Sequence, residues 1–316
     1  MKEMKIIDFE TIKAMAPTPL QCYQWVEEGL KMKKDAFLPA KISMKPGIPG
    51  VFYNCMPSAL PSLGYAGVKV VNRYPDRSPS LDSQILLYDL CTGENVALLD
   101  GNWITTMRTG AVAAHSIHLF AKETFETLGF IGLGNTARAT LQVLAELYPH
   151  TKFRIFLKKY KDQHDLFMES FQDHKNLSFQ VCSSYEELIR NSEVIVSAVT
   201  VFDDDICQDE WFQEGCLLVP IHTRGFTNCD LFFDKIFADD TGHVKGFKNF
   251  SKFRSFAEVS DVISGGRKGR ENDKERILAY NIGISLHDIY FASKIYEMAK
   301  GARDISLAPP KDKFWI

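Results

Sequence analysis

Long apolar runs are missing from this sequence. No stretch of about 18 consecutive apolar residues occurs among its 316 positions, so no transmembrane helix is expected. The N-terminal segment lacks the apolar core of a secretory signal and is instead rich in charged side chains: Lys2, Glu3, Lys5, Asp8 and Glu10. We therefore expect a soluble protein of the cytoplasm with no membrane partner.

Cysteine pairing motifs are also missing. The seven cysteines include no Cys-x-x-Cys pair, and an odd number suits a reducing compartment better than a disulfide framework. No group of histidines and cysteines has the spacing of zinc ligands. The sequence thus gives no reason to expect disulfides or a bound metal.

An excess of positive charge is absent as well. Lysine and arginine total 37 against 40 aspartate and glutamate residues, which gives a formal net charge of -3. This balance offers no basic surplus for binding nucleic acid or an anionic membrane. Apolar residues make up 45% and charged residues 24% of the chain, as in globular proteins, and the length suits about two domains.

The first part of the chain alternates short apolar runs with turns. A helix is expected over 20–34, and the segment 39–64 is rich in proline and glycine. Four strands are expected next, with a hairpin loop at Thr92-Gly93 between the last two: 51–54, 67–72, 83–89 and 95–100. A helix of small residues should cover 105–122. The pattern predicts an antiparallel, strand-rich domain.

From residue 127 onward, expected strands and helices alternate. The strands are 128–131, 153–157, 177–181, 193–199, 216–221 and 235–238. The helices are 136–147, 162–172, 184–190, 208–213 and 229–233, and a capping box from Ser184 to Glu187 opens the third. This alternation predicts a parallel, doubly wound sheet.

A polar, glycine-rich segment over 264–276 marks a boundary, and a final helix is expected over 275–300. The apolar face of that helix must be buried, and the simplest arrangement returns it to the first domain. The predicted fold is therefore α/β: a doubly wound, Rossmann-type domain (122–274) is inserted in a discontinuous α+β domain (1–121 plus 275–316).

A glycine-rich turn joins an expected strand to an expected helix. Gly132, Gly134 and Ala137, with Asn135 and Thr136 between them, form the pattern G-x-G-x-x-A after an apolar strand. In that context the pattern predicts a dinucleotide site, because the glycines allow a tight turn and close approach to a pyrophosphate. The helix N-terminus adds amides and a positive dipole end. A glycine turn without a ligand is the alternative.

Two lysines follow the next expected strand. An acid at this point would bind the ribose 2′-hydroxyl of NAD, but the sequence has Lys158 and Lys159. Because cations suit a 2′-phosphate, NADP(H) is favoured, while NAD(H) stays possible. Alternatively, both lysines are solvated loop charges.

Several motifs together resemble the ornithine cyclodeaminase/mu-crystallin family. The stretch from Asp100 to Ala111 is similar to its signature D-G-x-x-I/L-T-x-x-R-T-x-A. Other similar segments, between about residues 36 and 300, are 38–41 (LPAK), 56–57 (MP), 67–71 (GVKVV), 97–101 (ALLDG), 128–137 and 238–240 (ADD). The resemblance implies a homodimer that uses NAD(H) or NADP(H) on amino, imino or keto acids, with the discontinuous domain binding the substrate and forming the dimer.

The resemblance also assigns roles to residues. Arg108 matches the family's carboxylate-binding arginine and Lys69 its active-site lysine, while Lys41 stands where many members have arginine. A guanidinium can grip a carboxylate through two hydrogen bonds, and a lysine in an apolar strand needs a partner. Thr109 and Thr200 are further expected cofactor contacts. Structural roles for the arginine and the lysine are the alternatives.

One segment departs from the family pattern. Where cyclodeaminases carry an aspartate, this chain has Arg224, and His222 replaces the preceding glycine. A cation there would repel the ammonium of ornithine and could hold a second anionic group, so Arg224 is expected to bind substrate. Alternatively, Arg224 points to solvent or pairs with Asp230. The acidic run 203–205 is expected to be a solvated loop rather than a metal site.

His222 follows an expected strand at its carboxyl end, where open α/β sheets bind their ligands. A histidine that titrates near neutrality can act as a general acid, and His222 is also an expected cofactor contact. The alternative is a half-buried, hydrogen-bonded histidine.

These features predict an NAD(P)-dependent oxidoreductase that moves a hydride to or from the α-carbon of a small amino or imino acid, as a ketimine reductase or amino-acid dehydrogenase does. Lys69, Arg108 and His222 are the expected catalytic residues. Two alternatives stay open: an ornithine cyclodeaminase, and a non-catalytic, NADPH-dependent ligand-binding protein of mu-crystallin type.

Overall fold

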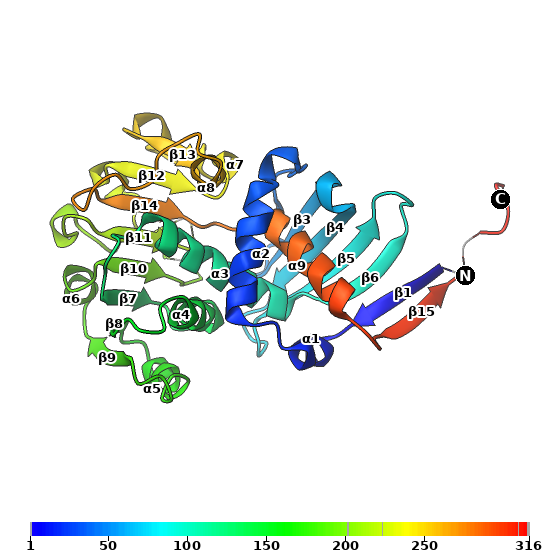
Figure 1. Ribbon diagram of the computed structural model, residues 1–316, viewed down its shortest axis with the longest axis horizontal. Helices are drawn as coiled ribbons and strands as arrows, with labels where there is room; N and C mark the ends of the chain where they lie inside the picture. Colours follow the sequence, from blue (N-terminus) through cyan, green and yellow to red (C-terminus); the bar gives the residue numbers. More distant parts are fainter. Residues whose placement is uncertain (1, 201, 223, 309, 315–316) are drawn as a thin grey trace. The chain divides into compact units, whose positions relative to one another are not determined.

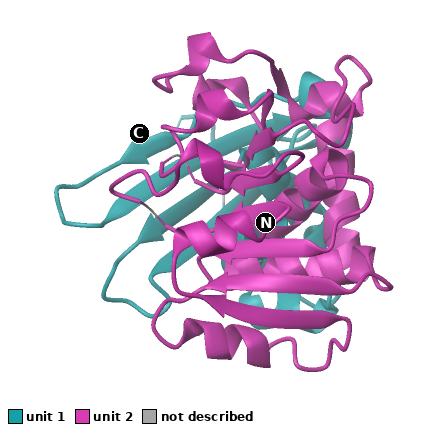
Figure 2. Ribbon diagram, turned by 90° about the vertical axis from the view of Figure 1, so that its left-hand side faces the viewer, with its two compact units in different colours: residues 1–18, 32–108, 284–316 teal, residues 19–31, 109–283 magenta. Residues whose placement is uncertain are grey.

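The computed structural model describes residues 2–200, 202–222, 224–308 and 310–314. Figure 2 colours the two compact units into which the chain divides. Unit 1 comprises Met1–Thr18, Met32–Arg108 and Ile284–Ile316, and unit 2 comprises Pro19–Lys31 and Thr109–Gly283. The boundaries expected after residues 121 and 274 both fall within unit 2.

The described residues of unit 1 form a seven-stranded mixed sheet. Its order is β15-β1-β6-β5-β4-β3-β2, with β1 and β6 parallel and the other neighbours antiparallel. The four expected strands are present as β3 to β6, whereas β1, β2 and β15 were not expected. The strands are β1 (Lys2–Ile7), β2 (Ile42–Met44), β3 (Phe52–Leu60), β4 (Tyr65–Arg73), β5 (Leu81–Asp89), β6 (Asn95–Asp100) and β15 (Arg303–Leu307).

One helix, α9 (Ser285–Met298), packs on β3, β4 and β5 (Figure 1). Gly67 of β4 makes this close approach possible. A Cβ at Gly67 would lie 2.6 Å from Cδ1 of Ile289 and would also meet the carbonyl oxygen of Leu86. The other helical elements of unit 1 are α1 (Phe9–Met15), η1 (Lys33–Asp35), η2 (Pro61–Leu63) and the start of α3 (Asn102–Phe120).

The helix expected over 275–300 is wrong in its first part. Ile277–Tyr280 is a strand, β14, and the helix α9 begins only at Ser285. All four residues of β14 are buried, so the strand shows no alternation of apolar and polar positions. A short apolar run of this kind cannot be distinguished from a buried helix by its period.

The described residues of unit 2 form an eight-stranded parallel sheet in the order β13-β12-β14-β11-β10-β7-β8-β9. This confirms the predicted α/β fold, in which a parallel Rossmann-like sheet is inserted between N- and C-terminal parts of a mixed sheet. The remaining strands are β7 (Thr127–Ile131), β8 (Phe153–Lys158), β9 (Leu177–Cys182), β10 (Val194–Ser197), β11 (Leu217–Pro220), β12 (Lys235–Ala238) and β13 (Phe256–Glu258).

The helices of unit 2 agree with the expected positions in most cases. Two expected helices, 208–213 and 229–233, are only short 3-10 turns, η3 (Asp209–Trp211) and η4 (Asp230–Phe232). Within the described ranges, no helix is long and apolar enough to cross a bilayer. The remaining elements are α2 (Pro19–Lys31), the end of α3, α4 (Asn135–Leu147), α5 (Gln163–Glu169), α6 (Tyr185–Arg190), α7 (Thr241–Val244), η5 (Phe250–Lys252) and α8 (Val259–Ile263).

Candidate active site

Lys69 is a buried cation in the sheet of unit 1. It lies on β4, opposite Met56 of β3 and Ile85 of β5, and its side chain is fully buried. Its Nζ donates a hydrogen bond of 2.7 Å to Oδ1 of Asp288 on α9, whose side chain is also fully buried. A buried lysine needs such a partner, because the loss of hydration otherwise disfavours its charge.

Arg108 joins the same carboxylate. Its Nε lies 3.0 Å from Oδ1 of Asp288, without the geometry of a hydrogen bond, and its side chain is 7% exposed. Within the described chain, Nε of Arg108 and Oδ2 of Asp288 are both buried and have no hydrogen-bond partner. The cluster of Lys69, Arg108 and Asp288 therefore keeps an unused donor and an unused acceptor.

Charges around Lys69 set its protonation. Burial and the positive charge of Arg108 lower the pKa of Lys69 to about 7, and Lys41 adds to the lowering. Asp288 opposes them through its charge and its hydrogen bond. Lys41 is half-buried just before β2, so the structure brings the three expected cations of unit 1 into one electrostatic group. At neutral pH, Lys69 can therefore both donate and accept a proton.

Asp288 was not among the residues expected from the sequence. One signal was available: an acid stands within an apolar helix, in which ten residues, including Asp288, are buried. Charged side chains are rarely buried without a partner. That rule predicts a cation nearby but not which one.

The dinucleotide fingerprint has the expected backbone in unit 2. Gly132 follows β7 with φ +84°, and a Cβ there would lie 2.7 Å from the backbone of Ala198. Gly134 is the N-cap of α4, and a Cβ there would meet no atom within 4 Å. Ala137 is fully buried. These residues fit a dinucleotide, because the space in front of Gly134 is open at a helix N-terminus.

The other expected cofactor residues also belong to unit 2. Lys158 ends β8, with its Nζ 5.1 Å from the ring centre of Tyr185 and 3.3 Å from the carbonyl of Lys159. Lys159 and Thr200 are exposed; Thr200 follows β10. The remaining expected residues lie on helices: Asn135 and Thr136 in the first turn of α4, and Thr109 on α3. The turn before α4, Lys158 and Thr200 thus follow β7, β8 and β10, three neighbouring strands of one parallel sheet.

His222 differs electrostatically from the expectation. It follows β11, is 8% exposed, and its Nε2 lies 2.6 Å from Oγ of Ser197 at the end of β10. Burial lowers the pKa of His222 to about 4, so the imidazole is neutral at physiological pH. The expected titration near neutrality is corrected on this ground. Ser197, its hydrogen-bond partner, was not expected from the sequence.

Arg224 lies in a mixed-charge pocket of unit 2. It is exposed and lines a cavity of about 480 Å³, together with Lys248 and the acidic run 203–205. Within that run, Asp205 accepts hydrogen bonds from Thr227. Asp230 is instead buried and accepts a hydrogen bond of 2.8 Å from Asn249. Among the described residues, no group of three potential ligands could hold a metal ion.

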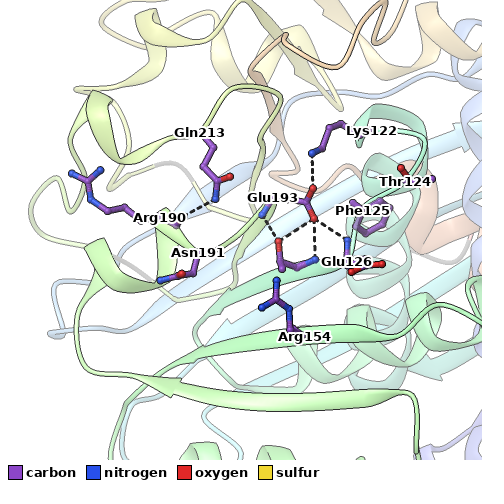
Figure 3. Close-up of a pocket in the computed structure, with 10 residues that line it drawn as sticks. Lys122, Thr124, Phe125, Glu126, Arg154, Arg190, Asn191, Glu193 and Gln213 are labelled. Atoms are coloured by element: carbon purple, nitrogen blue, oxygen red, sulfur yellow. Dashed lines mark hydrogen bonds and ion pairs between the residues drawn. The ribbon is translucent and has the colours of Figure 1, made fainter.

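A second cavity, of about 520 Å³, lies at the amino ends of the strands of unit 2 (Figure 3). Glu193 is its centre and accepts hydrogen bonds from Lys122 Nζ at 2.5 Å and from Thr127 N at 3.1 Å. Arg154 and Arg190 also line it. None of the expected site residues does, so this cavity adds nothing to the candidate active site.

The fold is that of an α/β protein in which a parallel, Rossmann-like sheet is inserted in a mixed sheet. The chain belongs to the ornithine cyclodeaminase/mu-crystallin family, whose model matches residues 11–303. This family contains NAD(P)-dependent amino- and imino-acid oxidoreductases and cyclodeaminases.

Three relatives illustrate the similarity. The chain is 28% identical over 284 residues to nodulation efficiency protein NfeD of Rhizobium meliloti, a match that covers 83% of this chain and 84% of that protein. It is 27% identical over 262 residues to a Delta(1)-pyrroline-2-carboxylate reductase of Bacillus cereus, covering 77% and 80%. The structure of an archaeal alanine dehydrogenase dimer with bound NAD is similar with a TM-score of 0.84 at 22% identity, covering 97% of this chain and 100% of that one.

Proposed function

We propose that this protein is an NADP(H)-preferring reductase or dehydrogenase that interconverts a small α-imino or α-keto acid and the corresponding amino acid. The observation that carries the proposal is the cluster of unit 1. The buried Nε of Arg108 has no hydrogen-bond partner in the described chain, and the planar guanidinium has the donor geometry that matches the two oxygens of a carboxylate. Activities named for the relatives, a pyrroline-carboxylate reductase and an alanine dehydrogenase, support the same substrate class.

The three expected cations of unit 1, Arg108, Lys41 and Lys69, have separate tasks. Arg108 binds the substrate carboxylate and so fixes the α-carbon, with Lys41 adding positive charge. Lys69 holds or removes the proton of the reacting nitrogen or oxygen, because its pKa of about 7 makes both charge states accessible. The nicotinamide, when bound, supplies or accepts the hydride.

His222 receives a different task from the one expected. With a pKa of about 4 and its Nε2 engaged by Ser197, it is a poor source of protons at pH 7. We assign it to the cofactor site with Ser197, as a neutral hydrogen-bonding pair at the carboxyl ends of β10 and β11. The residues expected to hold the dinucleotide are Gly132, Gly134, Asn135, Thr136, Lys158 and Lys159, with Thr109 and Thr200.

The test is absorbance at 340 nm with both reduced cofactors and a panel of cyclic imines, of keto acids mixed with amines, and of amino acids in the reverse direction. Turnover of an α-imino or α-keto acid supports the proposal. Binding of NADPH without turnover of any member of the panel would favour the non-catalytic ligand-binding alternative.

Two variants separate chemistry from folding. Lys69→Met removes the proton carrier while keeping the length of the side chain. Lys235→Met is the matched control, because Lys235 is also largely buried and forms ion pairs of 2.7 and 2.9 Å with Glu271 and Glu275. Only the Lys69 variant should lose turnover by orders of magnitude, since general acid–base catalysis contributes roughly 10²–10⁴-fold.

Ornithine cyclodeamination is the second candidate, and one observation favours it. The pocket of Arg224 also contains Asp203, Asp204 and Asp205. Their carboxylates offer an acid for a substrate ammonium. At the position where cyclodeaminases carry an aspartate, however, this chain has the cation Arg224. Release of ammonia from ornithine with catalytic NAD(P)+ would support this function over the reductase.

A further inference from the structure

Asp288 of unit 1 connects Lys69 to Arg108. One oxygen, Oδ1, lies 2.7 Å from Nζ of Lys69 and 3.0 Å from Nε of Arg108. The carboxylate comes from α9, the lysine from β4 and the arginine from α3. Gly67, two residues before Lys69, lets α9 approach β4 at Ile289, next to Asp288. The packing of the helix thus fixes the position of the acid.

Without Asp288, the charges that act on Lys69 would all be positive. Those charges come from Arg108 on α3, Lys41 before β2 and Asp288 on α9, and the strand neighbours Met56 and Ile85 are apolar. Within the part of the chain that the structure describes, Asp288 is the one acid in this set. Removing it would leave three cations together, and the buried lysine is the one that can lose its proton.

We propose that Asp288 is a positioning residue that keeps Lys69 protonated and holds Nε of Arg108, so that the unused donors of both side chains are available to the substrate. The proposal rests on the proposed function for the identity of that substrate. Asp288 itself acts through the two cations. Its second oxygen, buried and without a hydrogen-bond partner, is unlike the fully paired carboxylate of a purely structural ion pair.

The direct test is the titration of Lys69 in the complete protein. NMR of protein labelled with [ε-13C]lysine reports the charge of each lysine, and the missing signal in Lys69→Met assigns the resonance. In Asp288→Asn, the pKa of Lys69 should fall by roughly one unit or more, because an adjacent opposite charge is lost. Glu193→Gln is the control: it removes the partner of Lys122 in unit 2 and should leave the titration of Lys69 unchanged.

Kinetics provide a second readout. If Lys69 must be protonated for reduction, the fall of kcat/KM at high pH should begin at a lower pH in Asp288→Asn. The loss at pH 7 should be roughly fivefold for the first unit by which the pKa of Lys69 falls, and roughly tenfold for each further unit. Asp288→Glu keeps the charge but moves the carboxylate, so Lys69 should still titrate near its parental pKa while kcat falls. A merely structural role would leave the pH profile of folded Asp288→Asn unchanged.

The outcomes are distinct. An unchanged or raised pKa of Lys69 in folded Asp288→Asn overturns the inference. Should that variant not fold, parental kcat and KM in folded Asp288→Glu overturn it instead. A parent protein without any turnover refutes the proposed function alone, because the titration of Lys69 still decides the role of Asp288.

Discussion

Lys69 and Asp288 are 219 residues apart in the sequence, yet their side chains form a fully buried ion pair of 2.7 Å. The pair links β4 near the start of the chain to α9 near its end. Arg108, the residue of the family signature, reaches the same carboxylate oxygen. A discontinuous unit is therefore required to assemble these three side chains.

The pH dependence of reduction should follow Lys69. Because its pKa is lowered to about 7, the protonated form dominates below pH 7 and is lost above it. We expect kcat/KM for reduction to be constant at low pH and to fall about tenfold per unit above pH 7, and the oxidative direction to rise over the same range. In His222→Gln the fall of kcat/KM above pH 7 should persist, since His222 is already neutral there. If the fall disappears in that variant, the titrating group is His222 instead.

The two glycines of the fingerprint should respond differently to alanine. Gly132→Ala places a side chain at φ +84° and 2.7 Å from the backbone of Ala198, so the free energy of unfolding should fall by roughly 1–3 kcal/mol. Gly134→Ala meets no protein atom and should unfold at nearly the parental temperature, while its methyl group obstructs the approach of the pyrophosphate. Thermal unfolding and NADPH titration of both variants check this. Equal NADPH affinity of Gly134→Ala and the parent would contradict the assignment.

Cofactor preference should depend on Lys158. Its ammonium is held near the ring of Tyr185 at the end of β8, where a 2′-phosphate would be recognised. We expect NADPH to bind more tightly than NADH by up to roughly fivefold, since a partly exposed charge pair contributes up to ~1 kcal/mol. Lys158→Asp should erase that difference. Lys152→Asp is the control, because Lys152 is exposed and lies just before β8 begins. Fluorescence titration with both cofactors measures the two affinities.

The assembly should be a homodimer formed through an edge of the mixed sheet. Edge strand β2 is exposed along its length, and Ile42 and Met44 are 59% and 47% exposed. Apolar, unpaired edges favour pairing with another chain. Light scattering should give twice the chain mass at micromolar concentration, and Ile42→Lys should shift the equilibrium toward the monomer. A parental monomer under these conditions would refute the prediction.

Local patterns were sufficient for much of the fold, including the glycine-rich turn between β7 and α4. The alternation along β4 and the turn between β7 and α4 depend on residues close together in the sequence. Strand β14 was mistaken for helix because all its residues are buried, which removes the period that distinguishes the two. Asp288 was missed because its partners lie far away in the sequence. The neutral state of His222 follows from burial, which no single motif encodes.

The exposure of Arg224 limits the effect expected from its removal. The sequence suggested that this arginine selects an anionic group on the substrate. The structure places it, exposed, in a pocket that also contains three aspartates. Exposed ion pairs contribute only ~0.2–1 kcal/mol, so Arg224→Ala should raise KM for an anionic substrate by no more than roughly fivefold. The affinity for NADPH should not change.

The direction of the effect distinguishes two substrates. If the distal group is an anion, Arg224→Ala raises KM and Arg224→Asp raises it further. If the distal group is an ammonium that the aspartates bind, both changes lower KM, because they remove a repelling cation. Steady-state kinetics with a dicarboxylic and a diamino substrate, compared in Arg224→Ala and Arg224→Asp, measure the sign. Parental KM values for both substrates would mean that Arg224 faces solvent and takes no part in recognition.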